Sequence, residues 1–151
     1  MKFSTEILIR KPLQDVIHKM NNIENKKHWQ NGLYRIEHLS GNPGEFGAKI
    51  RLTYRFSGRQ MEVIETITKQ NFPEEFHADY ASKGIRNIQE NYFKSTKEGD
   101  TLWTCVNEYI PTNFIMHAMI VFMPRTYKKQ ARKYMANFKN FIENGTSVTH
   151  A

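Results

Sequence analysis

The sequence has little cysteine and no long uninterrupted hydrophobic run. Cys105 is the only cysteine, so no intramolecular disulfide can form and a reducing compartment is expected. Residues 1–7 lack the apolar core of a signal peptide. The longest apolar run, residues 114–123, is interrupted by His117 and is too short to span a bilayer. These absences predict a cytoplasmic protein without stable membrane insertion.

Metal and cofactor motifs are also missing. Segment 41–47 is rich in glycine, but it lacks the Gly-Lys-Ser/Thr ending of a phosphate-binding loop, so we interpret it as a tight turn. The six histidines show no metal-ligand spacing: they are His18, His28, His38, His77, His117 and His150. We therefore expect no metal site and no cofactor.

The 151 residues suffice for one domain, and the net charge of +7 is concentrated near its end. Residues 112–144 contain six Lys or Arg residues and one acid, Glu143. We interpret this basic surface as a solvated helix face and expect no nucleic-acid partner. Attraction of phosphates or anionic lipid is the alternative.

Residues 123–144 predict a long helix. Pro124 suits its first turn and Gly145 its C-cap. Its cations face away from an apolar stripe at helical spacing: Tyr127, Ala131, Tyr134, Met135, Phe138, Phe141 and Ile142.

The preceding chain reads mainly as strands. Two short helical stretches, after Pro12 and at 23–28, follow a first strand at 2–10. A short helix at 112–122, capped by Thr112 or Asn113, precedes the long one. The other predicted strands span 33–39, 46–56, 61–69, 75–81, 85–96 and 101–110. This order predicts an α+β domain, residues 1–144, with a curved antiparallel sheet of six to seven strands and a disordered polar tail at 145–151.

Alternation along the strands predicts their buried faces. In strand 46–56 the inner face would run from Phe46 to Phe56, and a two-residue turn is expected to pair Arg55 with Glu62. The last two strands allow two choices, one burying Phe93, Leu102, Val106 and Ile110, the other Ile88, Tyr92, Trp103, Cys105 and Tyr109. Both leave apolar surface outside, which suggests a homodimer.

Glu65 is the sharpest candidate for chemistry. It shares its predicted inner face with Met61, Val63 and Ile67, and a carboxyl group in an apolar cavity can act as a general acid or base. The alternative is a structural carboxylate bonded to a neighbouring strand or to a basic partner such as Arg86. Cys105 lies in an apolar run, so an inert buried thiol is expected.

Aromatic and methionine side chains can form a deformable apolar pocket, although an ordinary filled core is the alternative. The predicted ligand-binding residues are Trp29, Tyr54, Glu65, Tyr80, Tyr92, Trp103, Met119, Tyr134 and Phe138.

Over residues 2–144 the chain resembles the START-like superfamily, also called SRPBCC, which includes polyketide cyclase/dehydrase-like proteins. The resemblance rests on Lys11-Pro12, Trp29, the glycines at 41, 44 and 47, Glu65-Thr66-Ile67, Phe72-Pro73, Gly99-Asp100-Thr101 and Phe138-Lys139-Asn140-Phe141. It implies a helix-grip fold, in which the sheet wraps around the terminal helix and encloses a cavity for an apolar ligand.

Two functions are therefore expected. The first is noncatalytic binding of a hydrophobic small molecule, such as a lipid, an isoprenoid or a polyketide-like aromatic. The rival is a cyclase/dehydratase-type enzyme that uses Glu65 as acid or base. The lack of a catalytic constellation favours the binder, and fold resemblance alone cannot assign the chemistry.

Overall fold

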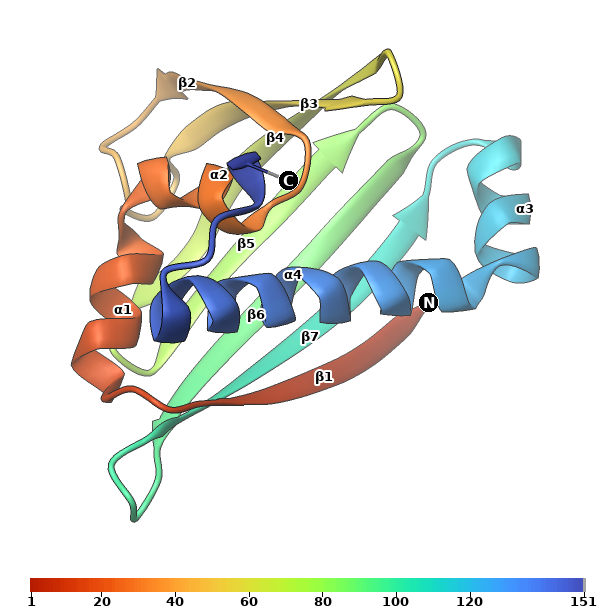
Figure 1. The fold of residues 1–151 in the computed structure, drawn as a ribbon. Helices are drawn as coiled ribbons and strands as arrows, with labels where there is room; N and C mark the ends of the chain where they lie inside the picture. The colour runs from red at the N-terminus through yellow and green to blue at the C-terminus, as the bar shows by residue number, and fades with distance from the viewer. Residues whose placement is uncertain (151) are drawn as a thin grey trace.

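The computed structural model describes residues 1–150 and has a single seven-stranded antiparallel sheet (Figure 1). In the order β1-β7-β6-β5-β4-β3-β2, its strands are Lys2–Ile9, Thr101–Pro111, Ile85–Ser95, Glu75–Ser82, Arg59–Asn71, Lys49–Phe56 and Leu33–Ser40. The helices are α1 (Leu13–Asn21), α2 (Lys26–Trp29), α3 (Phe114–Phe122) and α4 (Pro124–Asn144), with 3-10 turns η1 (Ile23–Asn25) and η2 (Val148–His150). The predicted α+β architecture with a long C-terminal helix is confirmed.

The sheet curves around α4, which lies across its concave side (Figure 1). Helices α1 and α2 lie at one end of α4, and α3 lies at the other. Met135 and Phe138 are the buried residues of α4, and the opposite side of the helix is basic. Burying a large apolar side chain contributes roughly 1.5–3 kcal/mol, so this stripe holds the helix in the curved sheet.

Aromatic rings join α2, β7 and α4 into the main core. The ring centroids of Trp29 and Phe138 are 5.4 Å apart, those of Trp103 and Phe138 are 5.5 Å apart, and all three rings meet edge to face. Phe93 stacks on Trp103 from β6. Polar contacts add to this packing, because the Asn137 side chain of α4 donates to the Trp29 carbonyl at 3.0 Å. The core therefore fixes the short helix α2 against α4.

The first part of the predicted strand 46–56 is not a strand. The ladder begins at Lys49, and Phe46 is 76% exposed rather than part of the inner face. The preceding turn closes through the Ala48 amide, which donates to the Glu45 carbonyl at 3.1 Å. The expected pairing of Arg55 with Glu62 is also wrong: with Phe56 opposite Arg59, Arg55 lies opposite Gln60.

The faces of β6 and β7 combine half of each predicted choice. Ser95 pairs with Thr101, so residues of the same parity share a face across the two strands. Phe93 therefore points inward together with Trp103 and Cys105, all three buried. The connection between the strands, which decides this register, was not settled by alternation within either strand.

The ends of the last helices follow their expected caps. The Asn113 side chain accepts a hydrogen bond from the Met116 amide at 2.8 Å, and Gly145 ends α4 in the left-handed conformation. In the predicted tail, 145–151, Ser147 Oγ lies 2.9 Å from His28 Nδ1, while Ala151 lies outside the described residues. The disorder of the tail stays a prediction. Within residues 1–150, no helix combines the length and the apolar character required to cross a bilayer.

Replacing Phe138 tests the aromatic core. Its side chain is fully buried, so Phe138→Ala should lower the free energy of unfolding by about 3–5 kcal/mol in denaturant titrations, through lost contacts and a cavity. Phe46→Ala is the matched control and should change it by less than about 0.5 kcal/mol, because that ring is exposed. Equal losses in the two variants would contradict this description of the core.

Candidate functional site

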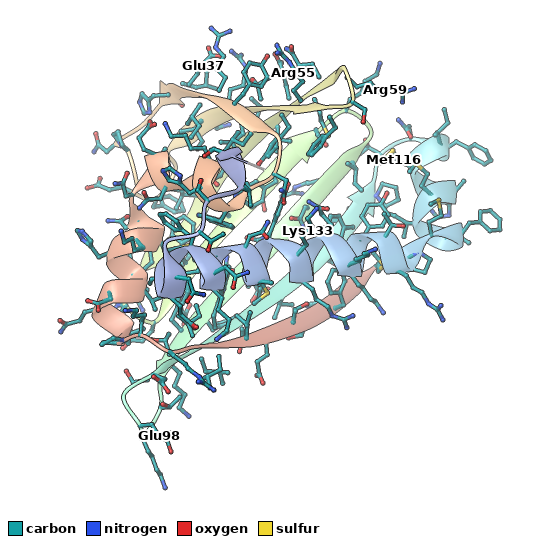
Figure 2. All side chains as sticks on the ribbon, viewed as in Figure 1. Glu37, Arg55, Arg59, Glu98, Met116 and Lys133 are labelled. Atoms are coloured by element: carbon teal, nitrogen blue, oxygen red, sulfur yellow. The ribbon has the colours of Figure 1, made fainter. Side chains whose placement is uncertain are left out.

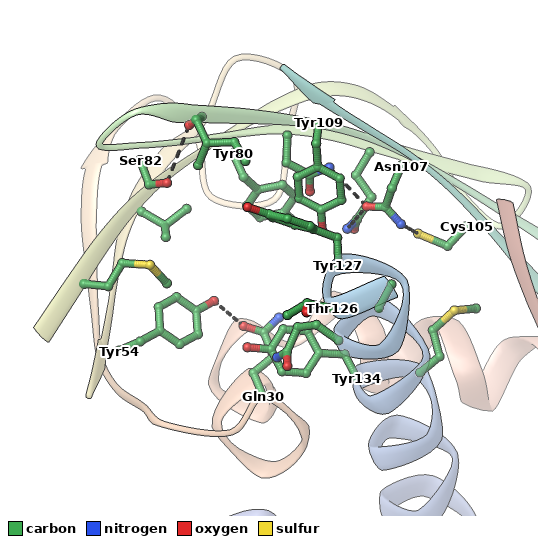
Figure 3. Close-up of a pocket in the computed structure, with 18 of the residues that line it drawn as sticks. Gln30, Tyr54, Tyr80, Ser82, Cys105, Asn107, Tyr109, Thr126, Tyr127 and Tyr134 are labelled. Atoms are coloured by element: carbon green, nitrogen blue, oxygen red, sulfur yellow. Dashed lines mark hydrogen bonds between the residues drawn. The ribbon is translucent and has the colours of Figure 1, made fainter. Parts of the chain in front are cut away.

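A cavity of about 490 Å³ lies between the concave face of the sheet and the N-terminal half of α4 (Figure 3). Aromatic, aliphatic and uncharged polar side chains form its wall. They are Trp29, Gln30, Tyr54, Phe56, Met61, Val63, Tyr80, Ser82, Ile85, Asn87, Gln89, Trp103, Cys105, Asn107, Tyr109, Met116, Thr126, Tyr127, Gln130, Ala131, Tyr134 and Met135.

The sequence of α4 explains where the cavity begins. Phe138 and its neighbours fill the sheet at the C-terminal half of the helix. Toward its N-terminus, α4 presents the small or polar side chains of Thr126, Gln130 and Ala131 to the cavity. The rings of Tyr127 and Tyr134 line the cavity from the same half of the helix, and Tyr127 packs on Tyr109 of β7, with ring centroids 4.9 Å apart. The same helix therefore closes one half of the sheet and leaves the other half hollow.

Paired amides form one side of the cavity. Asn107 Oδ1 accepts hydrogen bonds from Asn87 Nδ2 and Gln89 Nε2, each at 3.1 Å. Asn91 donates to Gln89 Oε1 at 3.2 Å and accepts from the Trp103 indole at 2.9 Å. The pairing satisfies polar atoms that would otherwise be costly to bury, and it fixes the amides that border the cavity.

Tyrosine hydroxyls supply further polar groups. Tyr54 donates to Gln30 Oε1 at 2.5 Å (Figure 3). Burial is the largest cause that raises the pKa of Tyr54, Tyr109 and Tyr134 above the ordinary value. These phenols stay neutral near pH 7, so they can orient a ligand by hydrogen bonds but cannot act as phenolate nucleophiles.

Glu65 lies beside the cavity wall, in a buried ion pair. Its Oε2 atom is 3.2 Å from Lys26 Nζ, and both side chains are almost fully shielded from solvent. Lys26 also lies over the Trp29 ring, 5.6 Å from its centroid. The pair therefore ties α2 to β4. Arg86, suggested as the basic partner, instead pairs with Asp79 at an exposed position.

Tyr80 connects the ion pair to the cavity. It is opposite Glu65 in the β4–β5 ladder and lines the cavity. Burial raises the pKa of Tyr80 most, followed by the negative charge of Glu65 and a hydrogen bond to it. Tyr80 therefore lies between Glu65 and the cavity.

The structure brings five of the nine predicted ligand-binding residues together: Trp29, Tyr54, Tyr80, Trp103 and Tyr134 line the cavity. The other four do not line it. Glu65 is held in the ion pair with Lys26, and Phe138 is packed inside the aromatic core. Tyr92 lies on the outer face, where its hydroxyl donates to Glu90, because the β6–β7 register turns it away. Met119 lies on the solvent side of α3.

Sequence reasoning did not place any particular amide among the predicted ligand-binding residues. Asn87, Gln89 and Asn91 occupy alternate positions of one strand, and Asn107 lies on the paired strand. This alternation of amides was visible in the sequence, but without the register it could not be assigned to the inner face. No cluster of three or more His, Cys, Asp or Glu side chains that could hold a metal occurs in the described part of the chain.

No protein-family model and no curated protein matches this sequence. Solved structures match almost the whole chain at low identity. Ginseng major latex-like protein 151 from Panax ginseng has a TM-score of 0.69 at 16% identity, covering 95% of this chain and 97% of that one. A conserved protein from Geobacillus kaustophilus has a TM-score of 0.77 at 10% identity, covering 94% of this chain and 95% of that one. Ara h 8.0201 has a TM-score of 0.73 at 12% identity, covering 94% of this chain and 97% of that one. This likeness shows that the chain has the Bet v 1-like helix-grip fold, which the START-like resemblance implied.

A double-mutant cycle tests the buried ion pair. Lys26→Met and Glu65→Gln should each cost about 3–5 kcal/mol of unfolding free energy, because each leaves a buried charge without its partner. The double variant should cost clearly less than the sum of the two. Lys27→Met is the control, since the Lys27–Glu24 pair is exposed and should contribute less than about 1 kcal/mol. Additive costs for Lys26 and Glu65 would show that the two charges do not interact.

The thiol gives a pH-dependent test. Burial raises the pKa of Cys105 to about 12, although a hydrogen bond from Asn107 acts in the opposite direction. Below this pH the thiol is protonated, so native protein at neutral to mildly alkaline pH should react with a disulfide reagent far more slowly than unfolded protein does. A native rate equal to the unfolded rate would contradict the inert thiol.

Proposed function

We propose that the cavity binds a neutral, largely apolar small molecule of lipid- or polyketide-like character, and that binding involves no chemical reaction. The fold supports hydrophobic ligand binding in general, because it is shared with the Bet v 1-like and START-like ligand-binding proteins. A volume of about 490 Å³ is within the range of small-molecule sites.

The observation that carries the proposal is the chemistry of the cavity wall. Among the described residues that line it, none is Asp, Glu, His, Lys or Arg. An ionised ligand group would lose its hydration there without gaining a charged partner, and burying such a group costs several kcal/mol or more. The wall therefore favours a neutral ligand over a fatty-acid carboxylate or a phosphate ester.

The polar edge of the cavity supports a ligand with a few hydrogen-bonding groups. Asn87, Gln89 and Asn107 are fixed by one another on the sheet side, and Tyr80 and Tyr134 are neutral phenols. Aromatic rings on the other walls match a flat or ring-containing molecule. A carbonyl or hydroxyl group at one edge of an otherwise apolar ligand would complement this arrangement.

The alternative function is a cyclase/dehydratase-type enzyme. One observation favours it: Tyr80 borders the cavity and lies opposite Glu65 in the β4–β5 ladder, so proton exchange with a bound carbonyl would pass through the Tyr80 hydroxyl. In this alternative Glu65 does not contact the ligand and would act as acid or base through Tyr80. Conversion of a bound candidate ligand that is abolished by Tyr80→Phe, with binding retained, would favour the enzyme over the binder.

A pair of naphthalene probes tests the binder. N-phenylnaphthylamine is neutral, and anilinonaphthalene sulfonate is an anionic analogue of it. The neutral probe should bind at least about tenfold more tightly, a difference of about 1.4 kcal/mol, measured by probe fluorescence and by the emission of Trp29 and Trp103, which line the cavity.

Two alanines on α4 provide the matched variants. Ala131→Phe places a ring in the cavity and should weaken N-phenylnaphthylamine binding at least about tenfold. Ala136→Phe adds the same ring to the exposed side of α4 and should leave binding unchanged. Equal binding by both variants, or preference for the anionic probe, would contradict the proposed site.

A further inference from the structure

The outer face of α3 is strongly apolar and exposed. Phe114, Ile115 and Phe122 are 83%, 71% and 81% exposed, and no other described part of the chain covers them. Together with Ala118, Met119 and Met123 they line a shallow groove along the helix. The inner face is separate, since Met116 lines the cavity and Ile120 is buried. Exposed apolar clusters of this kind mark interaction surfaces.

A cluster of cations follows this groove in the chain. Helix α4 starts two residues after α3 ends, and its first three turns contain Arg125, Lys128, Lys129, Arg132 and Lys133. No acidic residue occurs from Thr112 to Ile142, and within residues 1–150 none of these five cations forms an ion pair. Figure 2 shows Met116 and α3 at the opposite end of the molecule from Glu98, with Lys133 on α4 between them.

We propose that the outer face of α3 and the basic start of α4 form a docking surface for an anionic lipid bilayer. The apolar side chains would enter the boundary between headgroups and acyl chains, while the cations would contact the anionic headgroups. The charge of this segment complements an anionic membrane, because it contains cations and no acidic residue that would repel the lipid headgroups. The helix lies at the surface and does not span the bilayer.

A second copy of the chain fits this surface less well. A two-fold symmetric contact through α3 would bring the same residues of both copies together. The unpaired cations of the two α4 helices would then approach each other and repel. A nucleic acid would match the cations but would leave the phenylalanines and Ile115 without an apolar partner.

The docking surface borders the cavity without depending on its cargo. Met116 on the inner face of α3 and Tyr127 of α4 both line the cavity. Docking would therefore bring that end of the cavity next to a membrane, where neutral apolar molecules dissolve. The surface itself can be tested with ligand-free protein, so its failure would leave the binding proposal intact.

Vesicle flotation tests the proposal directly. The full chain should float with vesicles of phosphatidylcholine and phosphatidylserine in a three-to-one ratio, bind at least about tenfold more weakly to phosphatidylcholine alone, and be released by salt. Phe114→Ser/Phe122→Ser should weaken binding at least about tenfold by removing the apolar contact, and Lys129→Glu/Arg132→Glu should do so by reversing the charge.

Matched control variants distinguish binding through this surface from nonspecific adsorption to lipid. Phe46→Ser removes another exposed ring, and Lys97→Glu reverses an exposed charge in the β6–β7 turn, so both should bind as the unmodified chain does. Absence of flotation, or flotation unaffected by the α3 and α4 variants, overturns the proposal. So does a concentration-dependent dimer that Phe114→Ser/Phe122→Ser abolishes, because a second copy then occupies α3.

Discussion

The packing of the aromatic rings of α4 against Trp29 and Trp103 is the interaction on which the other features of the fold depend. Phe138 is fully buried between the two indoles, at edge-to-face geometry with both. This contact fixes α4 in the concave sheet and holds α2 at its end. On the N-terminal side of Met135, the helix carries Ala131, Gln130 and Thr126 together with the rings of Tyr134 and Tyr127, and this half of it borders the cavity. The cavity therefore lies where small and polar side chains interrupt the aromatic stripe of α4.

Buried charges and amides around this core interact with one another. Lys26 and Glu65 pair with each other, and the amides of β6 and β7 bond to one another. A partly satisfied network would be costlier than an apolar core, so these groups also fix the position of α2 and the polar edge of the cavity. The charges of Lys26 and Glu65 lie behind the cavity wall, and the described side chains that line the cavity are neutral. This separation links the stability of the fold to the kind of ligand that it favours.

Periodicity predicted the helix at 123–144 and the succession of strands along the chain, because each is a local property of the sequence. One of its two choices for the last strands also placed Trp103 on the inner face. What failed depended on contacts between distant segments. Tyr92 was expected in the pocket, and only the pairing of Ser95 with Thr101 turns it outward. Arg86 seemed a reasonable partner for Glu65, but Lys26 reaches it from a four-residue helix whose placement depends on Trp29. Phe138 was correctly expected on the buried face of the helix. Helical periodicity cannot, however, distinguish a ring that fills a core from one that lines a cavity.

Hydrogen exchange along α4, with and without N-phenylnaphthylamine, tests the central claim most directly. Helix α4 packs into the core around Phe138 and borders the cavity around Ala131. The amides of residues 134–142 should be strongly protected in both states, and those of residues 127–132 should gain protection when the probe binds. Uniform protection that does not change with the probe would contradict a helix that is packed at one end and roofs a ligand site at the other.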